Sequence, residues 1–141
     1  MTNETRQAPT TKTTARRTRR AVTVAAGAAG ALLVWTVADA LAGVDVAVRQ
    51  GGAVQRIGPV AVVVTALIAG LAAWALLALL ERTTGRAVRT YRIIASVVLI
   101  FSLAGPLGSG EGAGSRMALL GMHLVVGVVL IALLPGRRTR R

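Results

Sequence analysis

Residues 59–82 read PVAVVVTALIAGLAAWALLALLER. The first 22 of these residues carry no charged side chain, and a helix of that length is about 33 Å long at 1.5 Å per residue. The hydrocarbon core of a bilayer is about 30 Å thick, so the run is long enough to cross it. A proline opens the run, at the helix position where its missing N–H costs least. The stretch therefore predicts a transmembrane helix and makes the chain a membrane protein.

Three further apolar runs surround this helix, and one of them is weak. The third run is continuously apolar only over residues 93–104, before Gly105 and Pro106 interrupt it. To cross the bilayer it must begin near Val88, with the flanking arginines reaching back to the membrane surface and Tyr91 in the aromatic belt. We predict an all-α bundle of four transmembrane helices within residues 21–134, with spans at about 21–43, 59–80, 88–105 and 117–134.

The composition excludes several classes of chemistry. The chain is 54% hydrophobic, yet it carries a formal charge of +12 and has no cysteine. Disulfides, thiolate metal sites and dithiol redox chemistry are therefore absent, and the single histidine rules out a haem held by two histidines of one chain. The five acidic residues are scattered, and no serine, carboxylate pair or metal cluster forms a catalytic pattern. We expect no enzyme activity, no cofactor and no metal.

The distribution of basic residues predicts the orientation. Fourteen of the 17 lysines and arginines lie in the two tails and in the loop after the second span. The other two loops hold only Arg49, Arg56 and Arg116. Basic residues near span ends stay on the cytoplasmic side of a membrane. The chain is thus predicted to be a multi-pass protein of the cell membrane with both termini in the cytoplasm.

The tails are read as flanks of the bundle. Residues 1–20 and 135–141 are predicted to be basic cytoplasmic tails, the first of them disordered. Its segment RRTRR, residues 16–20, could bind nucleic acid or anionic lipid, but a topogenic flank of the first span accounts for it, and no nucleic acid is expected. Residues 40–42 read ALA, a pattern typical of signal-peptide cleavage. The preceding apolar run is longer than is usual for a signal peptide, so cleavage stays an alternative.

The first outer loop alternates like a β-hairpin. Residues 44–58 read VDVAVRQGGAVQRIG, and a turn at Gly51 and Gly52 supplies the positive φ angles that two-residue hairpins require. In this register Val46, Val48 and Ile57 share one face. Because an isolated hairpin is marginal in water, we expect that face to cover the rim of the bundle. An irregular loop with accidental alternation is the alternative.

The opposite face of the hairpin collects the charges. Asp45, Arg49 and Arg56 all fall on it, and Asp45 and Arg56 become diagonal neighbours within reach of an ion pair. This face is the candidate outer interaction surface. The second outer loop, GSGEGAGS at residues 108–115, is predicted to be flexible. It lacks the strand and the Lys-Ser/Thr pair of a phosphate-binding loop.

Two ionisable residues fall inside the predicted spans and are the candidate functional polar pair. Asp39 lies about one turn from the outer end of the first span. His123 lies six residues into the fourth span, about 9 Å deep, so both residues are expected in the outer half of the bundle at comparable depth. If these spans are neighbours, the two side chains could form a hydrogen-bonded protonation switch. In the competing interpretation, Asp39 reaches the interface and His123 bonds a backbone carbonyl or Thr36.

Small residues on the spans are interpreted as packing points. The spacing is that of close helix pairs, and the two tryptophans are interpreted as packing residues or interface anchors rather than as a binding box. The residues concerned are Ala26, Gly30, Ala66, Gly70, Ala73, Gly121 and Gly127, with Trp35 and Trp74.

Four segments carry a resemblance to a known family. They read GVDVAVRQGG (43–52), IGPVAVVVTALIAGLAAWALLALLER (57–82), SLAGPL (102–107) and GMHLVVGVVLI (121–131). Over residues 21–134 the chain resembles the small actinobacterial four-span integral membrane proteins of domain-of-unknown-function family 6069. The resemblance implies a four-helix membrane protein and carries no activity, cofactor or site residue with it.

The function that these observations favour is that of a non-enzymatic membrane component. Such a protein would lie in the lipid bilayer, assemble with itself or with another membrane protein, and present its hairpin outside. The alternative is a small transporter or channel that uses Asp39 and His123 on a polar path. The strong charge bias argues against dual-topology pairing of identical chains.

Overall fold

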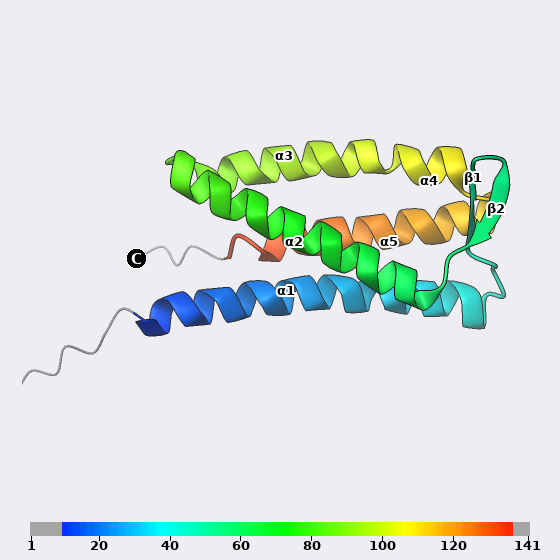
Figure 1. The fold of residues 1–141 in the computed structure, drawn as a ribbon, viewed down its shortest axis with the longest axis horizontal. Coiled ribbons are helices and arrows are strands. Elements are labelled where there is room, and N and C mark those ends of the chain that lie inside the picture. The colour runs from blue at the N-terminus through cyan, green and yellow to red at the C-terminus, as the bar shows by residue number, and fades with distance from the viewer. Residues whose placement is uncertain (1–9, 137–141) are drawn as a thin grey trace, which may run out of the picture.

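The structure is a computed structural model that describes residues 10–136. Residues 1–9 and 137–141, and with them four arginines of the C-terminal tail, lie outside the described part. Within it the chain forms a helical bundle with one small antiparallel sheet (Figure 1). The elements are α1 (Thr10–Thr36), η1 (Val37–Leu41), β1 (Ala47–Gln50), β2 (Ala53–Arg56), α2 (Pro59–Thr83), α3 (Ala87–Ser102), α4 (Ala104–Ser109) and α5 (Gly112–Leu133).

Four helical segments of the described chain are long and apolar enough to cross a membrane. They are residues 13–41, 59–83, 87–109 and 112–133, so α3 and α4 act as one span. α1 packs against α2 and α5, and α3 packs against the other sides of the same two helices. The first and last spans are therefore neighbours, as the polar-pair hypothesis requires. The chain is an all-α multi-pass membrane protein with a hairpin between its first two spans.

The first helix begins before the predicted span. Residues 10–20 are not a disordered tail but the first three turns of α1. This segment contains no glycine or proline, and its arginines are held from α2, because Arg16 and Arg20 both bind Glu81. A tertiary contact thus stabilises a helix that composition alone assigned to solvent.

α1 ends in a wide turn rather than a clean stop. Its last residues continue into the π-helical segment η1, whose wider winding is closed by a hydrogen bond from Ala42 N–H to the Val37 carbonyl oxygen (3.0 Å). Val44 N–H then bonds the Ala38 carbonyl (2.9 Å). This turn directs the chain from the end of α1 into β1.

The third and fourth spans are both longer than predicted. Gly105 and Pro106 do not end the third span: the helix breaks at Leu103 and resumes as α4. Pro106 is the third residue of α4, where a helix has no internal acceptor for the N–H that proline lacks. The fourth span begins at Gly112 instead of residue 117. The loop predicted over residues 108–115 is thus wrong, since only Gly110 and Glu111 separate the two helices.

The hairpin has the predicted register. Ala47 pairs with Arg56, Val48 with Gln55, Arg49 with Val54 and Gln50 with Ala53. Gly51 and Gly52 form the turn with φ angles of 56° and 85°, values that other residues adopt only with strain. Val46 is fully buried, and Val48 and Ile57 pack beside it on the bundle. The predicted lid is therefore confirmed.

Two apolar clusters hold the bundle together. The one near the hairpin joins Val46 to α1, α2 and α5, around Ala31, Val62 and Met122. The other lies towards the opposite end, around Leu77, Tyr91 and Leu130. Tyr91 is fully buried and donates a hydrogen bond to the Leu130 carbonyl (3.2 Å). Its predicted place in an aromatic belt is wrong, because it points between the helices and not towards lipid.

Glycines let the helices approach closely at several predicted points. A Cβ on Gly70 would lie 2.5 Å from Val24 Cγ1, and one on Gly30 would lie 2.7 Å from Val125 Cγ1. On α1, Gly27, Ala28 and Ala31 are buried, whereas the predicted packing residue Ala26 is exposed. The small-residue faces are therefore helix–helix contacts, and on α1 the spacing identified Gly30 but not Ala26.

Candidate functional site

The hairpin is fastened to the bundle by side chains of the α4–α5 junction. Glu111 accepts hydrogen bonds from Arg49 Nη2 (2.8 Å) and Arg49 Nε (3.1 Å). Glu111 N–H also donates to the Ala47 carbonyl (3.0 Å), and Val48 forms a β-bridge with Gly110. β1 is thus paired on both edges, and we call the Arg49–Glu111 pair with these backbone bonds the hairpin clamp.

A buried serine completes the clamp. Ser115 is 2% exposed, donates to the Asp45 carbonyl (2.7 Å) and accepts from Ala47 N–H (3.3 Å). On the other side, Trp35 Nε1 donates to the Ile57 carbonyl (2.8 Å). The two strands are therefore anchored to α5 and α1 by one polar side chain each, which fixes the position of the hairpin.

The charged face of the hairpin points away from the bundle, and its two arginines form ion pairs with Glu111 and Asp45. Asp45 Oδ1 lies 2.8 Å from Arg56 Nη2, and both side chains are exposed. The hydrogen bond from Arg49 is the largest effect that lowers the pKa of the Glu111 carboxyl, and the same bond raises the pKa of Arg49. Asp45, Arg49 and Arg56 thus share a face as predicted, but each cation already has an acidic partner.

The structure does not join Asp39 to His123. Within residues 10–136 no hydrogen bond or ion pair links them. His123 Nδ1 lies 2.8 Å from the carbonyl oxygen of Leu119, one turn earlier in α5. Asp39 is half-buried in η1. The geometry agrees with the competing interpretation, in which His123 bonds a backbone carbonyl.

The two residues also differ in depth. Gly121 faces Val34 and Gly30 faces Val125 across the α1–α5 contact, so His123 is level with about residue 32 of α1. Asp39 lies seven residues further along, about 10 Å nearer the hairpin. Comparable depth was predicted because the fourth span was started at residue 117. The true start at Gly112 places His123 about 16 Å into α5.

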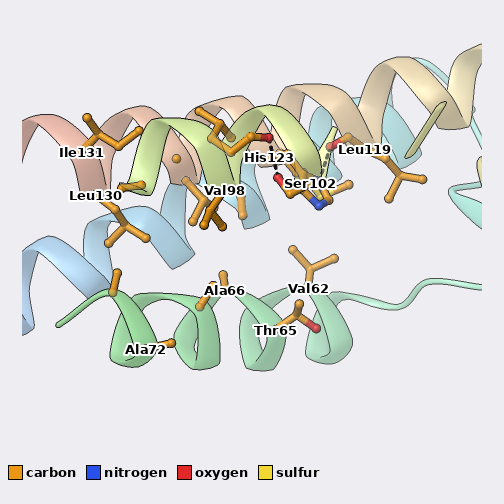
Figure 2. Close-up of a pocket in the computed structure, with 18 of the residues that line it drawn as sticks. Val62, Thr65, Ala66, Ala72, Val98, Ser102, Leu119, His123, Leu130 and Ile131 are labelled. Atoms are coloured by element: carbon orange, nitrogen blue, oxygen red, sulfur yellow. Dashed lines mark hydrogen bonds between the residues drawn. The ribbon is translucent and has the colours of Figure 1, made fainter. Parts of the chain in front are cut away.

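His123 instead lines a large cavity between α2, α3 and α5 (Figure 2). The volume is about 560 Å³, and most of its lining is alanine, valine and leucine. Four polar side chains line it: Thr65 from α2, Tyr91 and Ser102 from α3, and His123 from α5. Ser102 donates its hydroxyl proton to the Leu99 carbonyl (2.8 Å). An apolar chamber with a few polar groups is the usual form of a small-molecule site.

The end opposite the hairpin is rich in arginine and holds one buried charge. Arg20 is 5% exposed and its Nη2 lies 2.5 Å from Glu81 Oε1. Glu81 also binds Arg16, whose side chain is 54% exposed. Arg20 Nε is buried without a partner in the described chain. Glu81 thus compensates a buried cation where α1 and α2 meet, and we call this region the arginine end.

The comparison with protein families gives one match. A sequence profile described as a family of unknown function, DUF6069, matches residues 11–140. The chain belongs to DUF6069. No curated protein and no solved structure matches it. In this DUF6069 protein, no three His, Cys, Asp or Glu side chains of the described residues gather as a metal site would require.

Sequence reasoning missed Glu111, Ser115 and the cavity of this DUF6069 chain. Glu111 had one available signal, because it is the only acidic residue of the second outer loop and Arg49 is the hairpin arginine without a predicted acidic partner. Ser115 had none, since nothing in GSGEGAGS distinguishes it. The cavity depends on how α2 and α3 diverge, which the sequence of neither helix encodes locally.

Proposed function

We propose that this membrane protein is a non-enzymatic component that presents the hairpin as a rigid outer face for assembly with another membrane protein. The clamp carries the proposal: a hairpin fastened by Glu111, Ser115 and Trp35 stays ordered without a partner. An ordered loop loses less conformational entropy on docking than a flexible one. Exposed Val54, beside the charged pairs, supplies an apolar contact.

Photo-crosslinking in intact cells tests the proposal. A photoreactive amino acid replaces Val54 on the hairpin or, as the matched control, Met117 on α5, which is 70% exposed. We expect one crosslinked membrane protein at stoichiometric yield from position 54 and none from position 117. A crosslink to a second copy would mean that the protein assembles with itself and not with another membrane protein. The same products from both positions, or none from either, would overturn the proposal.

A second candidate function is a small transporter or channel, and the observation in its favour is that His123 lines a cavity at membrane depth. Asp39 does not line that cavity, so a path through both residues requires a different arrangement of the helices. Proton flux into liposomes containing the protein tests this function. Loss of flux in both Asp39→Asn and His123→Gln would support transport, and absence of flux in the unaltered protein would exclude proton transport.

A further inference from the structure

The cavity opens sideways between two spans. α2 and α3 meet at the arginine end, where residues 84–86 connect them, and separate towards the hairpin (Figure 1). Thr65, Ala69 and Ala72 on α2 and Val98 on α3 line the cavity and are exposed. Both helices are membrane spans. The opening therefore faces the hydrocarbon of the bilayer, and a ligand would enter from lipid.

The dimensions of the cavity admit a hydrocarbon chain but not a helix. Along α2 its lining runs from Ala61 to Leu76, a rise of about 22 Å. The volume of about 560 Å³ is the space open to the centre of a water molecule. With the water radius of about 1.4 Å added, the mean cross-section over that length is about 55 Å². A helix about 10 Å in diameter needs roughly 80 Å², and carbon contacts of about 3.5–4.0 Å give an extended hydrocarbon chain about 20 Å². The cavity is thus too narrow for a partner helix and wide enough for a hydrocarbon chain.

The polar atoms of the wall specify the ligand further. A backbone carbonyl can only accept, so His123 Nδ1 must be the donor in its bond to Leu119. The neutral ring then carries an acceptor lone pair on Nε2, which has no partner in the described chain. An unpaired acceptor in an apolar site is unfavourable until a donor meets it. Thr65, across the cavity on α2, also has no hydrogen-bond partner among residues 10–136.

The depth of His123 restricts the charge of the ligand. It lies about 16 Å from the start of the 22-residue helix α5, close to the middle of the span. A charged lipid headgroup stays at the membrane surface, because carrying it to the bilayer centre costs several kcal/mol. Only an uncharged donor can therefore reach His123 through the side opening.

We infer that the cavity binds the single apolar chain of a neutral lipid alcohol, with the lipid hydroxyl donating a hydrogen bond to Nε2 of His123. The inference goes beyond the proposed function and does not depend on the hairpin face. A free long-chain alcohol and a hydroxyl-bearing diacylglycerol share the required chemistry.

Photolabelling in phosphatidylcholine nanodiscs tests the inference with the full chain. The probe is a long-chain alcohol with a diazirine on its chain, and labelled peptides are mapped by mass spectrometry. We expect labels on the cavity-facing residues of α2, α3 and α5. The unlabelled alcohol should compete about two- to twelve-fold better than its methyl ether, the difference that one hydrogen bond makes. Equal competition by alcohol and ether would overturn the inference.

Matched variants locate the site. Ala69→Phe fills the cavity, and Ala75→Phe makes the same change at an exposed position of α2 that does not line it. Only the first should abolish labelling. His123→Leu should remove the preference for alcohol over ether, and His123→Gln, which keeps an acceptor oxygen, should restore it. Labelling that survives Ala69→Phe would refute the site.

Two competition arms distinguish the sources of the hydroxyl. Displacement by a single-chain alcohol but not by diacylglycerol would identify a free alcohol as the ligand, and displacement by both would extend the site to glycerolipids. Because the comparison of alcohol with ether uses the unaltered protein, it stays informative even if a variant fails to fold. Displacement by phosphatidylglycerol alone would contradict the requirement for a neutral lipid.

Discussion

At the scale of single residues, the fold depends on a few positions where a charge is buried or where two helices leave no space for a side chain. Arg20 is a buried cation at the arginine end, and Glu81 is its carboxylate partner. Gly70 lies where α1 and α2 pack so closely that a side chain would collide with Val24. Gly70 was among the predicted packing points, whereas Arg20 does not stand out from the arginines around it. The ion pair and the glycine each have an energetic consequence that can be measured.

Glu81→Gln should destabilise the protein by about 1–3 kcal/mol, because it leaves the buried guanidinium of Arg20 without its charge partner. Arg16→Gln is the control, since Arg16 is exposed and exposed ion pairs contribute at most about 1 kcal/mol. Thermal unfolding in detergent measures both. The double variant Arg20→Met/Glu81→Gln should recover part of the loss. A smaller effect for Glu81→Gln than for Arg16→Gln would contradict this account.

Gly70→Ala should cost about 1–3 kcal/mol through overpacking. The added Cβ would lie 2.5 Å from Cγ1 of Val24, and a β-branched side chain in a helix has almost no alternative rotamer. Gly108→Ala is the matched control, because that glycine lies in α4 with open space around it. The control should be neutral or slightly stabilising by helix propensity. Similar unfolding temperatures for the two variants would show that α1 and α2 move apart at little cost to accommodate the added methyl group.

At the scale of elements, the hairpin and the α4–α5 junction form one unit. The hairpin supplies Arg49 and an open strand edge, and the junction supplies Glu111 and Ser115. Each part lacks a partner by itself: a two-stranded sheet is marginal in water, and a glycine-rich link between helices favours disorder. Their contact explains why residues 108–115 are ordered although their composition predicts a flexible loop.

The clamp should loosen in acid. The folded state lowers the pKa of Glu111 from its ordinary value of 4.5. The stabilisation is therefore present above that value and is lost as the pH falls through the lowered one. In a Trp74→Phe background, the emission of Trp35, which bonds the Ile57 carbonyl, should shift to the red between about pH 5 and pH 3.

Two variants check the assignment of this acid transition. Glu111→Gln should show the red-shifted emission already at neutral pH and should respond little to acid. Asp45→Asn removes the acid of the other, fully exposed pair and should leave the transition in place. A transition that disappears with Asp45→Asn and persists with Glu111→Gln would mean that the Asp45–Arg56 pair causes the acid response, and not the Arg49–Glu111 pair.

At the scale of the whole molecule, the charge is separated by the bundle. The hairpin end carries three acidic residues and three arginines, so its formal charge is zero. At the opposite end, residues 10–20 and 81–92 of the described chain carry nine basic residues and one acidic residue, so their formal charge is +8. The basic side of a multi-pass protein is the cytoplasmic one. The fold thus predicts that the hairpin faces outward and that the α2–α3 turn faces the cytoplasm.

The chain has no cysteine, so single cysteine variants report its orientation directly. Gln55→Cys on the hairpin should react with a membrane-impermeant maleimide in intact cells. Gly85→Cys in the α2–α3 turn, an exposed position with open space around it, should react only after the cells are lysed. Equal labelling of both variants in intact cells would mean that the chain inserts in both directions.

Several levels of organisation were predictable from the sequence alone. The four spans follow from the length of uncharged apolar runs, and the hairpin register follows from strict alternation around Gly51 and Gly52. Both depend on residues close together in the chain. The family resemblance could also be read from the sequence, and the profile match over residues 11–140 confirmed it.

Only the tertiary structure decided where the ends of the helices lie and which side chains meet. The pairing of Arg20 with Glu81 and of Arg49 with Glu111 extends the first and last spans beyond their apolar runs. That extension moves His123 about one and a half turns deeper and away from Asp39. The cavity arises from the divergence of α2 and α3. These features depend on the relative shift and tilt of packed helices, which periodicity within one segment does not determine.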